Sequence, residues 1–191
     1  MEPSLHFSIP FFIFSFLGFS LPYCFLLSFL ALLPDFDVFF KVHRSATHSF
    51  LVYLPILFLA LLVYPFSVQI SSIFLAVYFS FTSHVLLDTL GGYTLALWPI
   101  VKDELSISFN FNIKFGSSFS LIPKVSLSRK KYTKAYFKEF EVRFATGEGL
   151  LISSILLLAS LIKLITRALK IFLVNFLPLA SQKLSSLALL S

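Results

Sequence analysis

The sequence predicts an all-α integral membrane protein: a bundle of about four to five transmembrane or re-entrant helices with a small cap. Three observations predict this class. Of the 191 residues, 58% are hydrophobic and only 13% are charged, whereas a soluble domain carries about 45–50% apolar and 25% charged residues. The apolar residues stand in long blocks, as membrane segments do. A single cysteine excludes a disulfide scaffold.

The apolar blocks cover residues 8–33, 50–68, 70–87 and 150–165, and a weaker block runs from residue 168 to the end. They predict one membrane domain over residues 1–191, with a motif-bearing core at 1–100, a basic cap segment at 101–146 and C-terminal helices at 147–191. Whether residues 168–191 cross the membrane, lie flat or re-enter is left open.

The first block has two interpretations because Gly18, Ser20 and Pro22 interrupt its middle, and proline breaks a helix interior. It is either one span or a re-entrant hairpin of two helices. Each half would reach only about 18 Å, short of the ~30 Å hydrocarbon core, so we favour the hairpin. A hairpin would return His6 to the membrane face of Asp35, and a single span would separate them.

Blocks 50–68 and 70–87 predict an antiparallel helical pair joined by a polar step around Gln69. Residues 34–49 and the long segment after Asp88 should therefore lie on one membrane face. Nine of the fifteen Lys and Arg residues fall between residues 102 and 143. The positive-inside rule places this face in the cytoplasm of a multi-pass cell-membrane protein.

The cap segment is predicted to contain a short β-hairpin followed by an amphipathic helix. Apolar residues alternate with polar ones over 107–115, residues 116–118 offer a turn, and residues 120–127 can pair back. Over 129–144 aromatic residues repeat every four positions, which suits either a helix on a membrane surface or a solvated cap.

Basic residues near the membrane favour lipid as the partner. The stretch 129–131 is Arg-Lys-Lys, but no nucleic-acid-binding signature accompanies it, so we expect contact with anionic headgroups and none with nucleic acid. Lys163, Arg167 and Lys170 form one helical stripe that predicts an interfacial anchor.

Ionisable side chains next to membrane segments are costly and are therefore functional candidates. Three clusters stand at block ends, and the predicted topology brings all three to one face: Asp35 with Asp37; His43, Arg44 and Thr47 with His48; and His84 with Asp88. His84 and Asp88 are four residues apart and share a helix face. Mixed imidazole and carboxylate ligands suit Zn, Mn or Fe. Taken singly, each residue is also an ordinary helix-end polar residue.

The order of the motifs resembles a known family. Pro-Asp-x-Asp at 34–37 precedes His-Arg-x-x-Thr-His-Ser at 43–49, Ser-His-x-x-x-Asp-x-x-x-Gly at 83–92 and Trp-Pro at 98–99. This order is similar to that of the predicted membrane-bound metal-dependent hydrolases of bacteria and archaea, which include a LexA-regulated inner-membrane protein. The resemblance covers roughly residues 1–100 and, more loosely, 146–148. Ser45 stands where the family often has glycine, and Val38 where it often has a polar residue.

The resemblance implies a hydrolase in which a metal-activated water attacks an ester or phosphoester, with a lipid-derived substrate favoured by the location. One or two divalent ions would be held by the six clustered Asp and His residues, with His6 as a further candidate ligand: Asp35, Asp37, His43, His48, His84 and Asp88. Asp37 or Asp88 would act as general base, and Arg44 would stabilise an anionic group.

The alternative is a non-catalytic membrane protein with a structural or transported metal site. Transport is the weaker form, because the main polar groups predicted in mid-membrane are Tyr53, Tyr64 and Tyr78. Acyl transfer through His84 and Asp88 lacks a supporting motif. The sequence does not define the oligomeric state.

Overall fold

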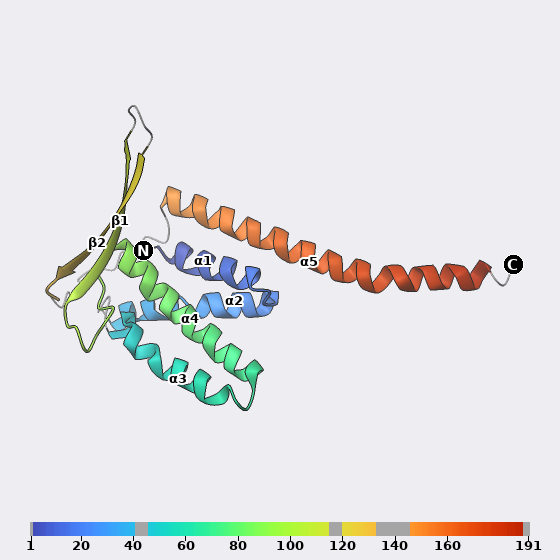
Figure 1. Cartoon of the computed structure of the whole chain (residues 1–191), viewed down its shortest axis with the longest axis horizontal. Coiled ribbons are helices and arrows are strands. Elements are labelled where there is room, and N and C mark those ends of the chain that lie inside the picture. The colour runs from blue at the N-terminus through green and yellow to red at the C-terminus, as the bar shows by residue number, and fades with distance from the viewer. Residues whose placement is uncertain (1, 41–45, 115–119, 133–145, 189–191) are drawn as a thin grey trace.

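The computed structural model describes residues 2–40, 46–114, 120–132 and 146–188, and within them the chain is mostly helical (Figure 1). The α-helices in this part are α1 (Pro3–Phe16), α2 (Leu21–Leu30), α3 (Leu54–Val63), α4 (Val68–Gly91) and α5 (Gly147–Ala188). Three 3-10 segments connect α2 to α3, namely η1 (Leu33–Phe40), η2 (Ala46–His48) and η3 (Phe50–Tyr53). Strands β1 (Glu104–Lys114) and β2 (Ser120–Lys130) form one antiparallel hairpin.

Helices α1 and α2 form the hairpin favoured for the first apolar block. The chain reverses at Gly18, whose φ of 91° lies in the left-handed region that favours glycine. Pro22 lies in the first turn of α2, where its missing N–H costs nothing. The hairpin returns the end of α2 to the end of the bundle where α1 begins, and η1 continues from there.

Helices α3 and α4 form the predicted antiparallel pair, but the link between them differs from the prediction. The turn lies at residues 64–67, and Gln69 is inside the first turn of α4. Ser67 caps α4 by accepting a hydrogen bond from the Ile70 N–H at 3.3 Å, and Pro65 precedes it. The Ser67 cap therefore sets the start of α4, whereas hydropathy alone had placed the link between the two helices at Gln69.

Helix α5 is one continuous helix that includes residues 168–188, and it runs alongside α1 and past the end of the bundle (Figure 1). Small side chains let the two helices approach closely. Ser8 Oγ on α1 lies 3.2 Å from Ser153 Oγ on α5, and Ser15 and Ser160, one heptad further along each helix, are also buried.

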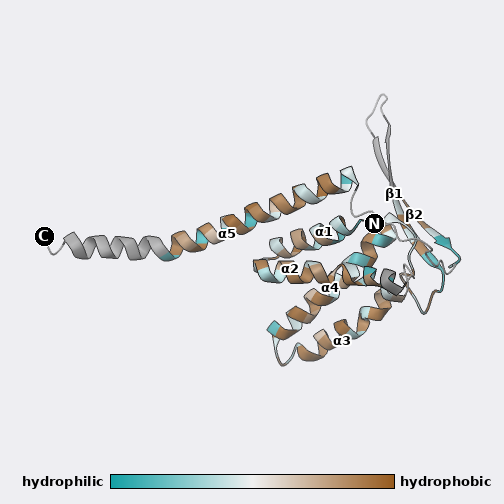
Figure 2. Cartoon of the chain, turned by 180° about the vertical axis from the view of Figure 1, so that it is seen from behind, coloured by the Kyte–Doolittle hydropathy of each residue, from teal (hydrophilic) through white to brown (hydrophobic). Residues whose placement is uncertain are grey.

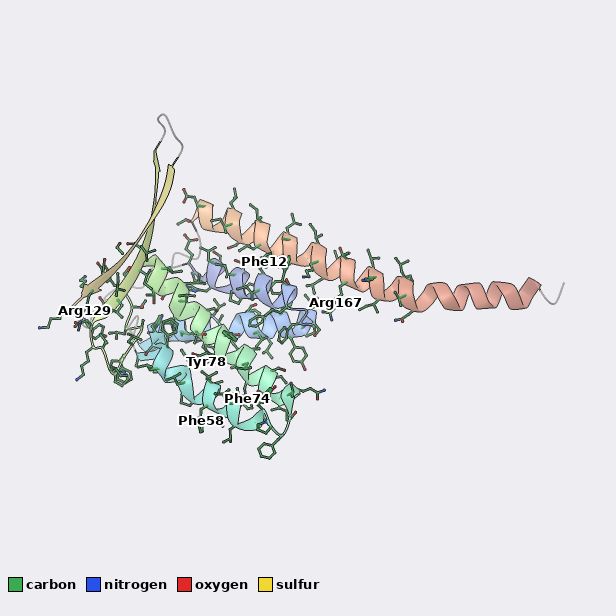
Figure 3. All side chains as sticks on the ribbon, viewed as in Figure 1. Phe12, Phe58, Phe74, Tyr78, Arg129 and Arg167 are labelled. Atoms are coloured by element: carbon green, nitrogen blue, oxygen red, sulfur yellow. The ribbon has the colours of Figure 1, made fainter. Side chains whose placement is uncertain are left out.

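Two cations on α5 bind the end of α1. Lys163 Nζ donates to the carbonyl of Phe16 at 3.1 Å, and the Arg167 guanidinium donates to the carbonyl of Gly18. Figure 3 shows Arg167 beside this turn. The carbonyls at a helix C-terminus lack intrahelical partners and carry partial negative charge, so both contacts are favourable. Part of the stripe predicted as an interfacial anchor thus has a specific protein partner.

The serine contact yields a prediction for stability. Ser153→Leu should destabilise the chain by about 1–3 kcal/mol, because the larger side chain cannot fit between α1 and α5. Ser154 is exposed, so Ser154→Leu is the matched control and should leave stability nearly unchanged. Thermal unfolding in detergent measures both variants, and equal loss in the two would contradict this packing.

The β-hairpin extends further than the sequence predicted. Its register pairs Glu104 with Lys130 and continues to Lys114 with Ser120. Arg129 and Lys130 therefore belong to β2, so the amphipathic helix predicted over 129–144 does not begin at Arg129. The remainder of that helix and the predicted turn fall on residues 133–145 and 115–119, outside the described residues. Backbone hydrogen bonds between Thr94 and Leu105 tie the hairpin to the chain after α4.

Apolar side chains cover the outside of the bundle. Within the described residues, α4 and residues Gly147–Asn175 of α5 are long and apolar enough to cross a membrane, while α1 and the segment Phe50–Val63 are shorter. Phe58 and its neighbours on α3 are exposed, Figure 3 shows Phe58 on the outside of α3, and Figure 2 shows that α3 is largely hydrophobic. Such a surface is typical of a protein in contact with lipid. The predicted count of four to five spanning or re-entrant helices stays a prediction.

Candidate metal centre

Histidine and aspartate side chains from four elements meet at the end of the bundle next to the β-hairpin. His6 comes from the first turns of α1, Asp35 and Asp37 from η1, His48 from η2, and His84 and Asp88 from the last turns of α4. The structure thus brings together all the predicted site residues that it describes. His43 and Arg44 lie outside the described residues.

Four of these side chains point one atom each at a common centre: Asp35 Oδ1, His48 Nε2, His84 Nε2 and Asp88 Oδ2. His48 Nε2 lies 3.3 Å from His84 Nε2, 3.3 Å from Asp88 Oδ2 and 3.5 Å from Asp35 Oδ1. His84 Nε2 lies 3.3 Å from Asp35 Oδ1 and 3.6 Å from Asp88 Oδ2. All four atoms are within 4.8 Å of one another.

Five of the six separations among these atoms are close to those around a tetrahedral metal ion. A metal bound at about 2.0–2.1 Å by four ligands in tetrahedral geometry separates its donor atoms by about 3.3–3.4 Å. Five of the six donor–donor distances span 3.3 to 3.6 Å, and the sixth, between the two carboxylate oxygens, is no longer than 4.8 Å. Two imidazole nitrogens and two carboxylate oxygens are also a donor set that zinc accepts.

In His48 and His84, the ring nitrogen that faces away from the centre, Nδ1, lies next to a hydrogen-bond acceptor. His84 Nδ1 lies 2.8 Å from the carbonyl oxygen of Ala31, and His48 Nδ1 lies 3.3 Å from Asp37 Oδ2. Each Nδ1–H donates to its acceptor, so each Nε2 faces the centre and can bind a metal ion that replaces its proton. This is the arrangement by which metal-binding histidines are usually oriented.

The segment that carries His48 is fixed by several hydrogen bonds. The Thr47 hydroxyl lies 3.3 Å from both Asp37 Oδ2 and the Pro34 carbonyl, so it connects η2 to η1. Tyr53 donates its hydroxyl hydrogen to the Thr47 carbonyl at 2.6 Å. Ser49 donates to the carbonyl of Trp98 at 2.6 Å, which ties the Trp-Pro motif to this segment.

His6 lies against the group of four without joining it. Its Nε2 is 3.1 Å from Asp88 Oδ1, the carboxylate oxygen that is not directed at the centre. Its ring stacks on that of His84 with centroids 3.9 Å apart. His6 Nδ1 is buried and has no hydrogen-bond partner among the residues described. His6 therefore orients Asp88 and supports the His84 ring.

The site is buried and rich in negative charge. His6, His48 and His84 are inaccessible to solvent, Asp88 is 1% exposed, and Asp35 is 25% exposed. Burial alone would lower the pKa of His48, but hydrogen bonds to Asp35, Asp37 and Asp88 outweigh it and raise that pKa to about 10. Three carboxylates around two imidazole edges thus favour a bound cation, whether a proton or a metal ion.

Burial and hydrogen bonding also have opposite effects on the pKa of Asp35. Burial alone would raise the pKa of Asp35, whereas hydrogen bonds to His48 and His84 hold that pKa well below its usual range. Asp35 is therefore a carboxylate at neutral pH, the protonation state in which it binds a metal ion.

The contact between Asp37 and His48 gives a second prediction. Asp37→Asn should weaken metal binding by about 10–100-fold, because the amide no longer holds His48 Nδ1–H as a carboxylate does. The isosteric change keeps the side-chain volume. Isothermal titration of the purified chain with zinc measures the affinity, and an unchanged dissociation constant would show that Asp37 does not orient His48.

Some contributors to the site were given no orienting role from the sequence. The Ala31 carbonyl, the Thr47 hydroxyl and the Tyr53 hydroxyl all orient the candidate ligands. Thr47 stands inside the quoted His-Arg-x-x-Thr-His motif, so its position was a usable signal. A backbone carbonyl such as that of Ala31 carries no signal in the sequence.

An apolar helical bundle with spanning-length helices and a buried group of histidine and aspartate at one end defines a membrane protein with a candidate metal centre. The family comparison agrees on the location: the chain belongs to the YdjM inner membrane protein family, whose model matches residues 11–171. No curated protein and no solved structure matches the chain. The match includes every member of the group of four.

Proposed function

We propose that Asp35, His48, His84 and Asp88 bind one divalent metal ion and that the protein is a membrane-bound metal-dependent hydrolase. The near-tetrahedral spacing of the four donor atoms carries this proposal. Zinc fits these separations best, while manganese and iron accept the same donor types. His43 and Arg44 keep the roles predicted from the sequence, as a further ligand and as the group that stabilises an anion.

The residues around the centre divide the chemical tasks. When bound, the ion would polarise the scissile group and lower the pKa of a water molecule. Of the two general bases predicted from the sequence, Asp88 is the one that directs an oxygen at the centre, and it would take a proton only when that oxygen is not bound to the ion. Asp37 lies behind His48 and orients it.

The surroundings of Asp35 favour an amphiphilic substrate. Asp35 is the most exposed member of the group of four. Its neighbours Leu33 and Phe36 expose 43% and 52% of their surfaces. A substrate whose polar end reaches Asp35 would place its apolar part against these two side chains. We therefore propose an ester or phosphoester derived from a membrane lipid.

The distribution of basic residues supports a multi-pass protein with this site at the cytoplasmic face. Eleven of the fifteen Lys and Arg residues lie between residues 41 and 143, and those of them that the structure describes lie in the β-hairpin or next to it, at the site end of the bundle. Cysteine accessibility tests the orientation. Lys131→Cys should react with an impermeant maleimide only after the membrane is opened, whereas Gln69→Cys at the opposite end should react in intact spheroplasts. Reaction of both from the same side would contradict the orientation.

A hydrolysis assay tests the proposed activity. The purified chain in nanodiscs is loaded with zinc or manganese and offered phosphatidic acid, other phospholipids and soluble phosphoesters. We expect metal-dependent release of product from a lipid substrate, abolished by a chelator and restored by the ion. A fully metal-loaded protein without turnover of any substrate would favour the non-catalytic alternative.

One observation favours that alternative, a structural metal site. Four protein ligands complete a tetrahedral shell, and closed shells are typical of structural zinc. In that case removal of the ion should unfold the site end of the bundle. The catalytic interpretation instead requires that Asp35, the most exposed of the four ligands, leaves the ion so that substrate can bind there.

A further inference from the structure

The β-hairpin has one apolar face that the described residues do not cover. On β2, Val125 and Leu127 point to the same face and expose 60% and 68% of their surfaces. The register places Ile107 of β1 opposite Leu127 and Leu105 opposite Arg129 on the same face, and the two β1 side chains are half-buried. The other face carries serines, with Ser108 Oγ hydrogen-bonded to Ser126 Oγ at 2.7 Å. The hairpin is thus amphipathic across its two faces.

Such a hairpin needs a surface to lie on. Two strands with an uncovered apolar face are at best marginally stable in water. Within the described part of the chain β1 pairs with β2 and also packs against α4, whereas the strongly exposed Val125 and Leu127 belong to β2. The exposed aliphatic side chains therefore indicate a partner that accepts an extended apolar face.

The position of the hairpin favours lipid as that partner. Figure 1 shows the strands running across the direction of the helices, at the end of the bundle that holds the candidate metal centre. A membrane crossed by α4 and α5 has its surface in this direction. Lys102, Lys130 and Lys131 are exposed near the base of the hairpin, and anionic headgroups attract such residues.

We propose that the apolar face of the hairpin, formed by Leu105, Ile107, Val125 and Leu127, inserts into the headgroup region of the anionic cytoplasmic leaflet. The hairpin would then hold the site end of the bundle at a fixed depth. The proposal rests on the membrane location and is independent of the bound metal.

Fluorescent labelling of single cysteines tests this placement. Cys24 is buried, and the unsubstituted chain checks that it does not react. Val125→Cys and Leu127→Cys are compared with Ser126→Cys and Ser128→Cys, which alternate with them on the opposite face. Each carries an environment-sensitive fluorophore in nanodiscs of phosphatidylethanolamine and phosphatidylglycerol, with either doxyl-labelled lipid or aqueous iodide as quencher.

We expect doxyl lipid to quench the labels at 125 and 127 several-fold more strongly than those at 126 and 128, and iodide to show the reverse order. Iodide quenching of all four labels alike would overturn the proposal. Labels at 125 and 127 that are shielded from both quenchers, and become accessible when the protein is diluted in lipid, would assign the face to a second copy of the chain instead.

Discussion

Zinc should raise the thermal unfolding temperature of the detergent-purified chain by about 5–10 °C when the ion is present at 100 times its dissociation constant. Selective binding to the folded state at that ratio contributes about 2.7 kcal/mol, and each kcal/mol shifts the transition of a chain of this size by about 2–4 °C. The effect is expected because the four donor atoms meet only in the folded bundle, where they come from η1, η2 and α4.

Asp88→Asn is the matched variant for this measurement. It preserves the size of the side chain but removes the charge from the centre of the group. We expect the zinc-dependent shift to disappear in this variant, while Ser154→Leu, at an exposed position of α5 outside the group of four, keeps it. A full shift in Asp88→Asn would mean that zinc binds elsewhere in the chain.

Loss of a metal ligand should also abolish turnover. We expect His48→Gln to reduce lipid phosphoester hydrolysis by about a thousandfold or more, because polarisation by the ion is worth several kcal/mol and 1.36 kcal/mol is tenfold in rate. The Nε2 atom of His48 lies 3.3 to 3.5 Å from the donor atoms of all three partners in the group. Initial rates in nanodiscs at saturating zinc measure the effect.

Gln69→Ala provides the control for this rate, because Gln69 lies in the first turn of α4 at the opposite end of the bundle and is exposed. It should retain the unsubstituted rate. Circular dichroism of His48→Gln, matched to the parent, separates lost chemistry from lost fold. If the His48→Gln variant is folded, free of zinc and as active as the parent, the metal ion is not required for hydrolysis.

Much of the candidate site could be predicted from the sequence because topology links its parts. Two adjacent antiparallel helices necessarily return the chain to one face, so Asp35, His48 and Asp88 had to lie at the same end. The helical spacing of His84 and Asp88 then placed both on one side of α4. The membrane face on which His6 lies depended on whether the first block is a hairpin or a single span, and the interruption at Gly18 indicated the hairpin.

Features that depend on local hydrogen bonds were harder to predict. The α3–α4 link follows the Ser67 cap, which a hydropathy pattern does not register. Arg129 pairs in β2 although a four-residue aromatic repeat predicted a helix there, because the strand pairing continues to Lys130. The continuous α5 and its contacts from Lys163 and Arg167 to α1 depend on packing between distant segments.

Metal content tests the central claim most directly. The chain is purified in detergent, dialysed against zinc and then against metal-free buffer, and analysed by inductively coupled plasma mass spectrometry beside Asp88→Asn and His84→Gln. We predict about one zinc ion per chain in the parent and close to none in either variant. A parent chain without stoichiometric zinc, manganese or iron, or variants that retain the full amount, would contradict a metal centre formed by Asp35, His48, His84 and Asp88.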